Sequence, residues 1–272
     1  MTGAGMMECK KALVEAEGDL DKAVDVLRTR GLAAVAKKAG RATNEGTVMA
    51  LVSEDGKTGA LVELNCETDF VSMNEKFKGY AEKIARAALA NKPADLDALK
   101  ASEIDGETVE AIVTDAIHVM GENTELARFQ VVEADAIASY IHGGGKIGVL
   151  VQFGLEGIDP TAEAFKTCGH DVAMQVAAAA PVAANRESVD PAVIEHEMSI
   201  YKAQAAESGK PEAIQEKIAT GRLEKFFKES VLTEQEFVKN PDQTISEYVD
   251  GVAKELGGTI KVEGFARFVM GE

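Results

Sequence analysis

The histidines and cysteines of this 272-residue chain are the side chains that would carry enzymatic chemistry. Their spacing favours neither a metal site nor a catalytic pair. The four histidines and three cysteines are scattered, without the close pairs that metal sites use. His170 follows Cys168 by two residues, which on a helix directs the two side chains to different faces. We therefore expect no metal ligand, no bound cofactor and no catalytic Cys–His pair.

The glycine-rich segment after His142 is the second chemical candidate. Gly143–Lys146 has the glycines of a phosphate-binding loop, but Ile147 occupies the position where a Ser or Thr would bind Mg²⁺. The segment is also similar to a hydrolase oxyanion loop, yet the chain has no Gly-x-Ser-x-Gly motif. A hairpin turn equivalent to Asp55–Gly56 is the preferred interpretation. A hydrolase or transferase that uses His142 and this loop is kept as the alternative function.

The segment Asn65–Val71 points to binding rather than catalysis. It ends a predicted strand, and a related segment 88 residues downstream has Glu156–Asp159 where this one has Thr68–Val71. The folding unit therefore does not itself require Thr-Asp-Phe-Val. An aromatic ring beside a carboxylate at an exposed junction is typical of an interface anchor. The other interpretation, in which Phe70 folds back onto the core, stays open.

The elements that hold this segment are predicted from a hydrophobic period of two. Strands 47–52 and 60–67 flank a hairpin turn at Asp55–Gly56. The second strand is expected to bury its apolar residues and to expose the polar ones, which are Glu63, Asn65 and Glu67. A capping box at Ser72–Glu75 then predicts the start of a helix.

The same hairpin-plus-helix unit recurs 88 residues downstream. Phe77 corresponds to Phe165, and Pro93 corresponds to Pro181. Two copies predict two related subdomains side by side. Residues 102–120 are expected to form a helix and residues 125–132 a strand, and residues 259–269 are expected to form the last strand.

Helical segments precede and interrupt this core. Residues 5–31 predict two short helices, the second ending at Gly31, and a basic linker follows at 33–46. Because this unit buries little surface alone, Met6 and Met7 face either a partner or their own core. Apolar residues at helical spacing on both sides of Ser208–Pro211 predict an antiparallel helical hairpin, which serves either binding or a structural role.

The predicted fold class is therefore α+β, with four parts. Residues 1–40 form a small helical domain and residues 41–135 the first core subdomain. Residues 136–186 and 232–272 form the second core subdomain, and residues 187–231 form the projecting helical arm.

Composition restricts the function further. The chain has 46 acidic and 29 basic residues, a net charge of −17 that repels nucleic acid. Its apolar runs are shorter than the roughly 18 residues of a membrane span, and three widely spaced cysteines favour a reducing cytoplasm. The residues thus indicate an acidic, cytoplasmic protein with several contact sites for a partner, and no membrane or nucleic acid partner.

Three motifs in this order resemble the signatures of the bacterial elongation factor Ts family. They are Thr2–Leu13, Asn65–Val71, and His142–Gly143 followed by Lys146–Val151. The resemblance covers essentially the whole chain. It implies a guanine-nucleotide exchange factor that binds the GDP-bound form of elongation factor Tu and promotes GDP release in translation elongation, without covalent chemistry.

The resemblance also implies roles for single residues. The element Thr68–Val71 would enter the GTPase domain of the partner, where Phe70 would wedge between histidines and Asp69 would contact the adjoining helix, so that Mg²⁺ is dislodged. Further partner contacts are implied for Met6, Met7, Met120, Gly121 and His142.

The parts of the chain have counterparts in the family as well. The resemblance implies a ubiquitin-associated-like fold for the N-terminal unit, a coiled coil for the arm, and a complex of one-to-one or two-to-two stoichiometry. Family members have a further helix before the Thr2 motif and often continue beyond Gly271–Glu272. We therefore expect the chain to lack the first helix of its N-terminal domain.

Overall fold

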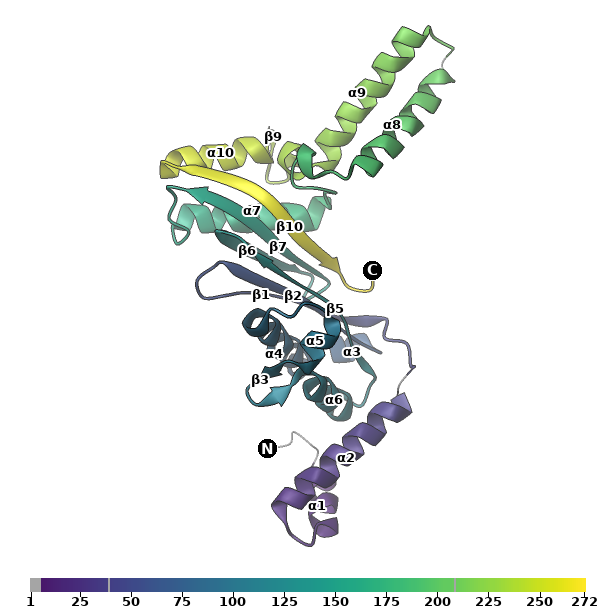
Figure 1. The fold of residues 1–272 in the computed structure, drawn as a ribbon, viewed down its shortest axis with the longest axis vertical. Coiled ribbons are helices and arrows are strands. Elements are labelled where there is room, and N and C mark those ends of the chain that lie inside the picture. The colour runs from purple at the N-terminus through teal and green to yellow at the C-terminus, as the bar shows by residue number, and fades with distance from the viewer. Residues whose placement is uncertain (1–5, 39, 208) are drawn as a thin grey trace.

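The protein combines helices with antiparallel strands, in the mixed class that the sequence predicts (Figure 1). The computed structural model describes residues 6–38, 40–207 and 209–272. One three-stranded sheet has the order β1-β2-β5, and a second has the order β10-β7-β6. Their strands are β1 (Glu45–Val52), β2 (Thr58–Cys66), β5 (Thr124–Glu133), β6 (Ala136–His142), β7 (Ile147–Glu156) and β10 (Thr259–Val269).

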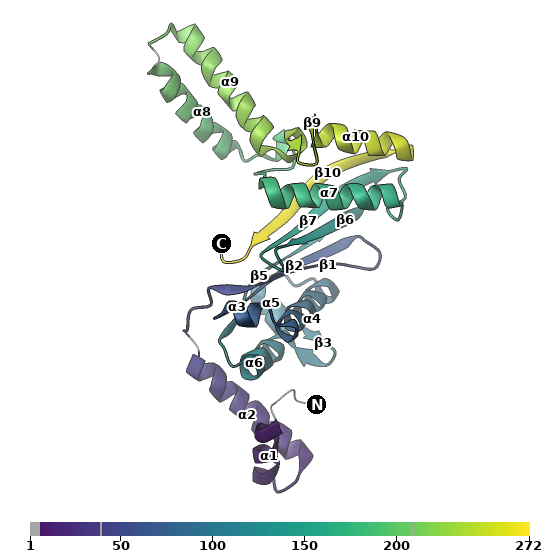
Figure 2. The same cartoon turned by 180° about the vertical axis from the view of Figure 1, so that it is seen from behind.

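The two sheets face each other, and each has helices on its outer side (Figures 1 and 2). Those of the first sheet are α4 (Glu75–Asn91), α5 (Leu96–Ala101) and α6 (Val109–Met120), and those of the second are α7 (Glu163–Ala179) and α10 (Ile245–Leu256). Between the sheets, Val48 and Leu61 pack in one cluster with Leu150. Gly148 permits this approach, because a Cβ there would lie 2.4 Å from a methyl carbon of Val48.

The predicted exposed face of strand β2 is wrong. Every residue of β2 is buried, and Glu63 is only 1% exposed. The second sheet covers the face that the alternating pattern assigned to solvent. The Glu63 carboxylate accepts from Nε of Arg128 at 2.7 Å and from the backbone N–H of Gly271 at 3.0 Å. The polar residue in this strand is therefore a buried carboxylate, which pairs with Arg128 of the neighbouring strand β5 on the face that the second sheet covers.

The repeated unit is observed. Helix α4 and helix α7 each have 17 residues, and both their first and their last residues are offset by 88. Each helix ends at a residue with left-handed backbone, Lys92 with φ 44° and Ala180 with φ 45°. A proline follows each of them, Pro93 and Pro181, which prevents the helix from continuing.

Two predicted details near these helices are wrong. Ser72 does not cap α4; it ends the short helix α3 (Asp69–Ser72), and Asn74 caps α4 by accepting from the N–H of Lys76 at 2.9 Å. The helix predicted over 102–120 begins only at Val109. It is preceded by a hairpin of β3 (Glu103–Ile104) and β4 (Glu107–Thr108), because Asp105–Gly106 adopts left-handed backbone.

The N-terminal unit consists of α1 (Met6–Glu15) and α2 (Leu20–Lys38), joined by a turn in which Asp19 accepts from the N–H of Asp21. The predicted end at Gly31 is wrong. Gly31 lies inside α2 and is buried, with Thr114 of α6 the nearest contact for a Cβ there. The glycine thus permits close packing of two helices instead of ending one. Thr2–Gly5 of the N-terminal motif lie outside the described residues.

The arm is a hairpin of two helices that projects from the second sheet (Figure 1). It comprises α8 (Pro191–Ala206) and α9 (Glu212–Ser230); Ser208, in the predicted break, lies outside the described residues. The arm joins the core through η1 (Arg186–Ser188) and η2 (Leu232–Glu234), and β8 (Glu236–Phe237) and β9 (Asn240–Thr244) lead into α10. Arg186 binds Glu224 of α9 at 2.8 Å and also Glu234, so one guanidinium joins both ends of the arm.

Among the helices of the described ranges, none is both long and apolar enough to cross a bilayer. The four-part division at residues 40, 135, 186 and 231 stays a prediction.

Candidate functional site

The motif Thr68–Val71 forms a turn at the end of β2, and this turn is the candidate site. Asp69 and Phe70 are exposed, and Phe70 keeps 80% of its surface accessible. Val71 packs instead against the core of the first sheet, and Ser72 is buried. The turn is thus anchored by its second half. The interpretation in which Phe70 folds back onto the core is excluded.

The second repeat provides the comparison within the chain. Ile158 stands where Phe70 stands in the first repeat, and it packs against the core of the second sheet. The same position therefore holds a core-facing apolar residue in one copy and an exposed aromatic ring in the other. The fold does not force the ring outward, so its exposure is a property of this turn.

The carboxylate of Glu122 holds the first half of the turn. Its Oε2 accepts from the backbone N–H groups of Glu67 at 3.1 Å and Thr68 at 3.0 Å, and its Oε1 accepts from the Thr68 hydroxyl at 2.6 Å. Glu122 follows Gly121, which ends α6 with left-handed backbone. Glu122 could not be predicted from local patterns, because 54 positions separate it from Thr68.

A second network connects the same loop to the chain that follows α2. Glu67 Oε1 accepts from the N–H of Asn123 at 2.6 Å and from Arg41 at 3.3 Å. The Asn123 side chain in turn donates to the carbonyl of Arg41 at 2.9 Å. The hydrogen bond from Asn123, together with that from Arg41, lowers the pKa of Glu67. The carboxylate therefore stays ionised at neutral pH, and the network persists there.

A second exposed apolar side chain lies beside Phe70. Met73, at the end of α3, is 61% exposed and was not predicted as a site residue. The predicted capping box at Ser72–Glu75 made Met73 part of the start of α4, so its exposure was not expected. Phe70 and Met73 together give this turn an apolar surface next to the carboxylate of Asp69.

The other predicted contact residues lie in different parts of the molecule. Met120 is half-buried and Gly121 exposed, both directly before Glu122 and therefore next to the turn. Met6 and Met7 are exposed on α1, so the interpretation in which they fill their own core is excluded. His142 is exposed at the end of β6, where its Nδ1 is 3.1 Å from the Tyr140 hydroxyl.

The glycine segment Gly143–Lys146 is a hairpin turn that rests on the first sheet. The carbonyl of Gly145 accepts from the N–H of Val48 at 2.7 Å, and a Cβ at Gly145 would lie 2.1 Å from the Thr47 hydroxyl. The amino group of Lys146 is bound to Glu45 at 2.6 Å. The Lys146 side chain and the Gly145 carbonyl therefore both make contacts with the first sheet. This arrangement supports the turn interpretation over a phosphate or oxyanion loop.

The thiols near the candidate sites are poor nucleophiles. Cys66 and Cys168 are buried, and burial raises the pKa of each to about 12. Within the part of the chain that the structure describes, no group of three His, Cys, Asp or Glu side chains could hold a metal ion. The geometry thus offers the hydrolase alternative no nucleophile at these cysteines.

This arrangement predicts how the three cysteines react with a thiol reagent. At neutral pH, a thiol of pKa about 12 is a thiolate in roughly one molecule in 10⁵, so Cys66 and Cys168 react very slowly in the folded protein. Cys9, which is partly exposed, is expected to react first. The measurement is a titration with a chromogenic disulfide, with the protein in urea as the control in which all three react. Prompt reaction of more than one thiol in the folded protein would contradict the structure.

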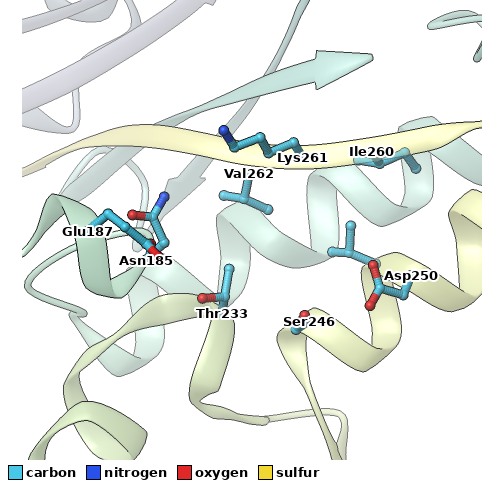
Figure 3. A pocket seen from close by; sticks show the side chains of 9 residues that line it. Asn185, Glu187, Thr233, Ser246, Asp250, Ile260, Lys261 and Val262 are labelled. Carbon is cyan, nitrogen blue, oxygen red and sulfur yellow. The ribbon is translucent and has the colours of Figure 1, made fainter. Parts of the chain in front are cut away.

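A further hollow lies at the base of the arm and encloses about 530 Å³ (Figure 3). Its lining comes from the arm base, α10 and β10 and includes Asn185, Thr233, Asp250 and Lys261. Figure 3 shows the amino end of Lys261 apart from the carboxylate of Asp250, and Asn185 on another side of the hollow. The charged groups do not converge on one point, so the hollow lacks the arrangement of a catalytic site.

The chain is similar to known proteins over its whole length. The family model Elongation factor TS matches residues 67–272. Elongation factor Ts of Trichlorobacter lovleyi is 48% identical over 277 residues, that of Clostridium botulinum (strain Alaska E43) is 47% identical over 274, and that of Clostridium perfringens (strain SM101) is 46% identical over 275. Each comparison covers 100% of this chain and 89% of the relative. The chain therefore belongs to the elongation factor Ts family, whose members act in translation elongation.

Proposed function

We propose that this protein is a guanine-nucleotide exchange factor that binds elongation factor Tu in its GDP-bound form and promotes GDP release. The observation that carries the proposal is the exposed ring of Phe70 beside Asp69, on a turn whose counterpart in the second repeat is packed against the core. Family membership supports the partner. The protein then acts by binding in the cytoplasm and carries out no covalent chemistry of its own.

The turn would act on the metal ion that the partner holds. Phe70 enters the GTPase domain as a wedge, Asp69 contacts the adjoining helix, and Thr68 and Val71 fix the turn that carries them. Mg²⁺ compensates the charge of the diphosphate, so a displacement of Mg²⁺ lowers the affinity for GDP. GTP can then occupy the emptied site.

The remaining exposed residues would extend the interface. Contacts with the partner are proposed for Met6, Met7, Met120, Gly121 and His142. Methionine side chains adapt to different apolar surfaces, which suits Met6 and Met7 on the exposed face of α1. The N-terminal unit would be a ubiquitin-associated-like domain and the arm a coiled coil, in a one-to-one or two-to-two complex.

The direct test uses elongation factor Tu loaded with fluorescent GDP. An exchange factor accelerates GDP release when it is present at a small fraction of the partner concentration, since each molecule acts repeatedly. A passive scaffold accelerates nothing, and a hydrolase would change the nucleotide instead of releasing it. Release at the spontaneous rate with the full chain added would refute the proposal.

Thermodynamic linkage provides a second expected result. If this protein weakens GDP binding to the partner by some factor, GDP weakens the binding of this protein by the same factor. Titration of GDP into the preformed complex is therefore expected to dissociate it, as measured by size-exclusion chromatography or light scattering. ATP at the same concentrations is the control. A complex whose affinity is the same with and without saturating GDP would contradict an exchange mechanism.

A further inference from the structure

We infer that Glu122 is the positioning residue of the Thr68–Val71 turn: its carboxylate holds the turn in the orientation that presents Phe70 to the partner. The inference rests on the proposed function and adds a residue outside the motif. It is carried by the three hydrogen bonds that Glu122 accepts, two from backbone N–H groups and one from the Thr68 hydroxyl.

The short helix α3 needs such a support from outside. A threonine in front of a helix ordinarily caps it by accepting from a backbone N–H with its hydroxyl oxygen. Among the described residues, Thr68 makes no such cap, and its hydroxyl donates to Glu122 at 2.6 Å instead. A helix of four residues is not stable by itself. The orientation of the turn therefore depends on a group contributed by another element.

Glu122 is well placed to give a fixed orientation. It follows the left-handed Gly121 that ends α6, and the next residue, Asn123, is itself bound to Glu67. The carboxylate therefore extends from a loop that is held at both ends. Hydrogen bonds to an ionised group are shorter and roughly twice as strong as those between neutral groups. Three of them on one carboxylate fix Glu67 and Thr68 immediately before Asp69 and Phe70.

Positioning matters here because most of the ring lies outside the core. Phe70 is 80% exposed, so the backbone of the turn sets the direction from which its side chain projects. If the turn moves, the ring is presented in many orientations, and the partner must select the productive one. A mobile turn then lowers the maximal rate of GDP release more than the affinity, since the proposed contacts at Met6, Met7 and His142 remain.

The test replaces Glu122 and measures two quantities on the full chain. Amide hydrogen exchange of the free protein reports whether Glu67 and Thr68 lose protection in Glu122→Ala. Stopped-flow GDP release from elongation factor Tu, over a range of concentrations, gives the maximal rate and the half-saturating concentration. We expect a maximal rate about tenfold lower and a half-saturating concentration within about threefold of the wild type, since small displacements of a positioned group have effects of this size or larger.

The chain offers matched variants. Glu122→Gln keeps one oxygen that accepts hydrogen bonds and replaces the other with an amide NH₂ group, so it is expected to retain part of the maximal rate. Thr68→Val replaces the hydroxyl with a methyl group and is expected to lower the maximal rate. Thr68→Ser keeps the hydroxyl and is expected to retain most of the maximal rate. Glu125→Ala removes a nearby carboxylate that is bound to Thr43 at 3.3 Å and not to the turn, and is expected to behave as the wild type.

The outcomes separate the two proposals. If the wild type does not accelerate GDP release, the proposed function fails, and the role of Glu122 fails with it. If the wild type is active and Glu122→Ala reaches the same maximal rate, only the positioning role is refuted. Full protection of the Thr68 amide in Glu122→Ala would refute the positioning role as well, because the turn would then be held by other groups.

Discussion

Replacement of Phe70 with alanine is expected to slow GDP release from elongation factor Tu at least about tenfold, which corresponds to about 1.4 kcal/mol of lost coupling. The melting temperature is expected to stay nearly unchanged. Phe70 is 80% exposed, and exposed positions usually shift the free energy of unfolding by less than about 0.5 kcal/mol. A ring in the core would instead cost about 3–5 kcal/mol. Differential scanning calorimetry and stopped-flow release on the same preparation measure both quantities.

Two controls distinguish a wedge from a general apolar contact. Ile158→Ala changes the equivalent position of the second repeat, where the side chain packs against the core, so it is expected to lower stability without affecting exchange beyond any loss of folding. Val182→Ala removes an exposed apolar side chain at the base of the arm and is expected to change neither quantity. A Phe70→Ala protein that melts far lower, or that exchanges at the wild-type rate, would refute the assignment. Partial complex formation should survive, because the contacts proposed for Met6, Met7 and the Met120–Gly121 region are unchanged.

Local patterns were sufficient to predict much of the fold. The Asp55–Gly56 turn, the strand after it and the presence of helix α4 follow from turn chemistry and hydrophobic period, although the cap of α4 was predicted wrongly. The offset of 88 residues between the two units was visible in the sequence and recurs in the bounds of α4 and α7. Each of these features is determined by residues that are close together in the sequence, so a single sequence is enough to predict it.

Two of the wrong predictions share a cause, since each depends on a surface that a distant element provides. Glu63 alternates with apolar residues as an exposed residue would, yet the second sheet buries it. Gly31 has the properties of a helix end, yet it packs beside Thr114 of α6, and the helix continues. A sequence pattern shows which face of an element is polar. It does not show whether solvent or another charged residue satisfies that face.

The candidate site divides in the same way. The motif Asn65–Val71 was found from its position and from the difference between the two repeats, and its exposure is confirmed for Phe70. Glu122 was missed, since the contact that joins it to Thr68 spans 54 residues. Met73 was missed because the predicted capping box assigned Ser72–Glu75 to a helix start, although Met73 is exposed at the end of α3. The exposure of Phe70 could thus be predicted from the turn itself, whereas its support by Glu122 could not.

The ion pair of Glu63 with Arg128, on the inner face of the first sheet, gives the largest expected effect on stability. Arg128→Met is expected to lower the free energy of unfolding by about 3–5 kcal/mol, because it leaves the carboxylate of Glu63 buried without its cation. Arg128 also donates to the carbonyl of Val269 at 2.7 Å and lies over the ring of Phe268, so the change weakens the attachment of β10 to the first sheet. Urea unfolding followed by circular dichroism measures this loss.

Two further variants show whether burial of the charge causes the effect. Arg86→Met breaks an ion pair with Asp105 whose side chains are 50% and 56% exposed, and is expected to cost less than about 1 kcal/mol. The double variant Glu63→Met with Arg128→Met removes both charges, and is expected to recover most of the loss, because the remaining penalty of an unpaired buried carboxylate disappears. If the double variant were less stable than Arg128→Met, the loss would come from the packing of the arginine over Phe268 and not from the buried charge. If Arg128→Met cost no more than Arg86→Met, the buried carboxylate of Glu63 would not depend on its arginine partner.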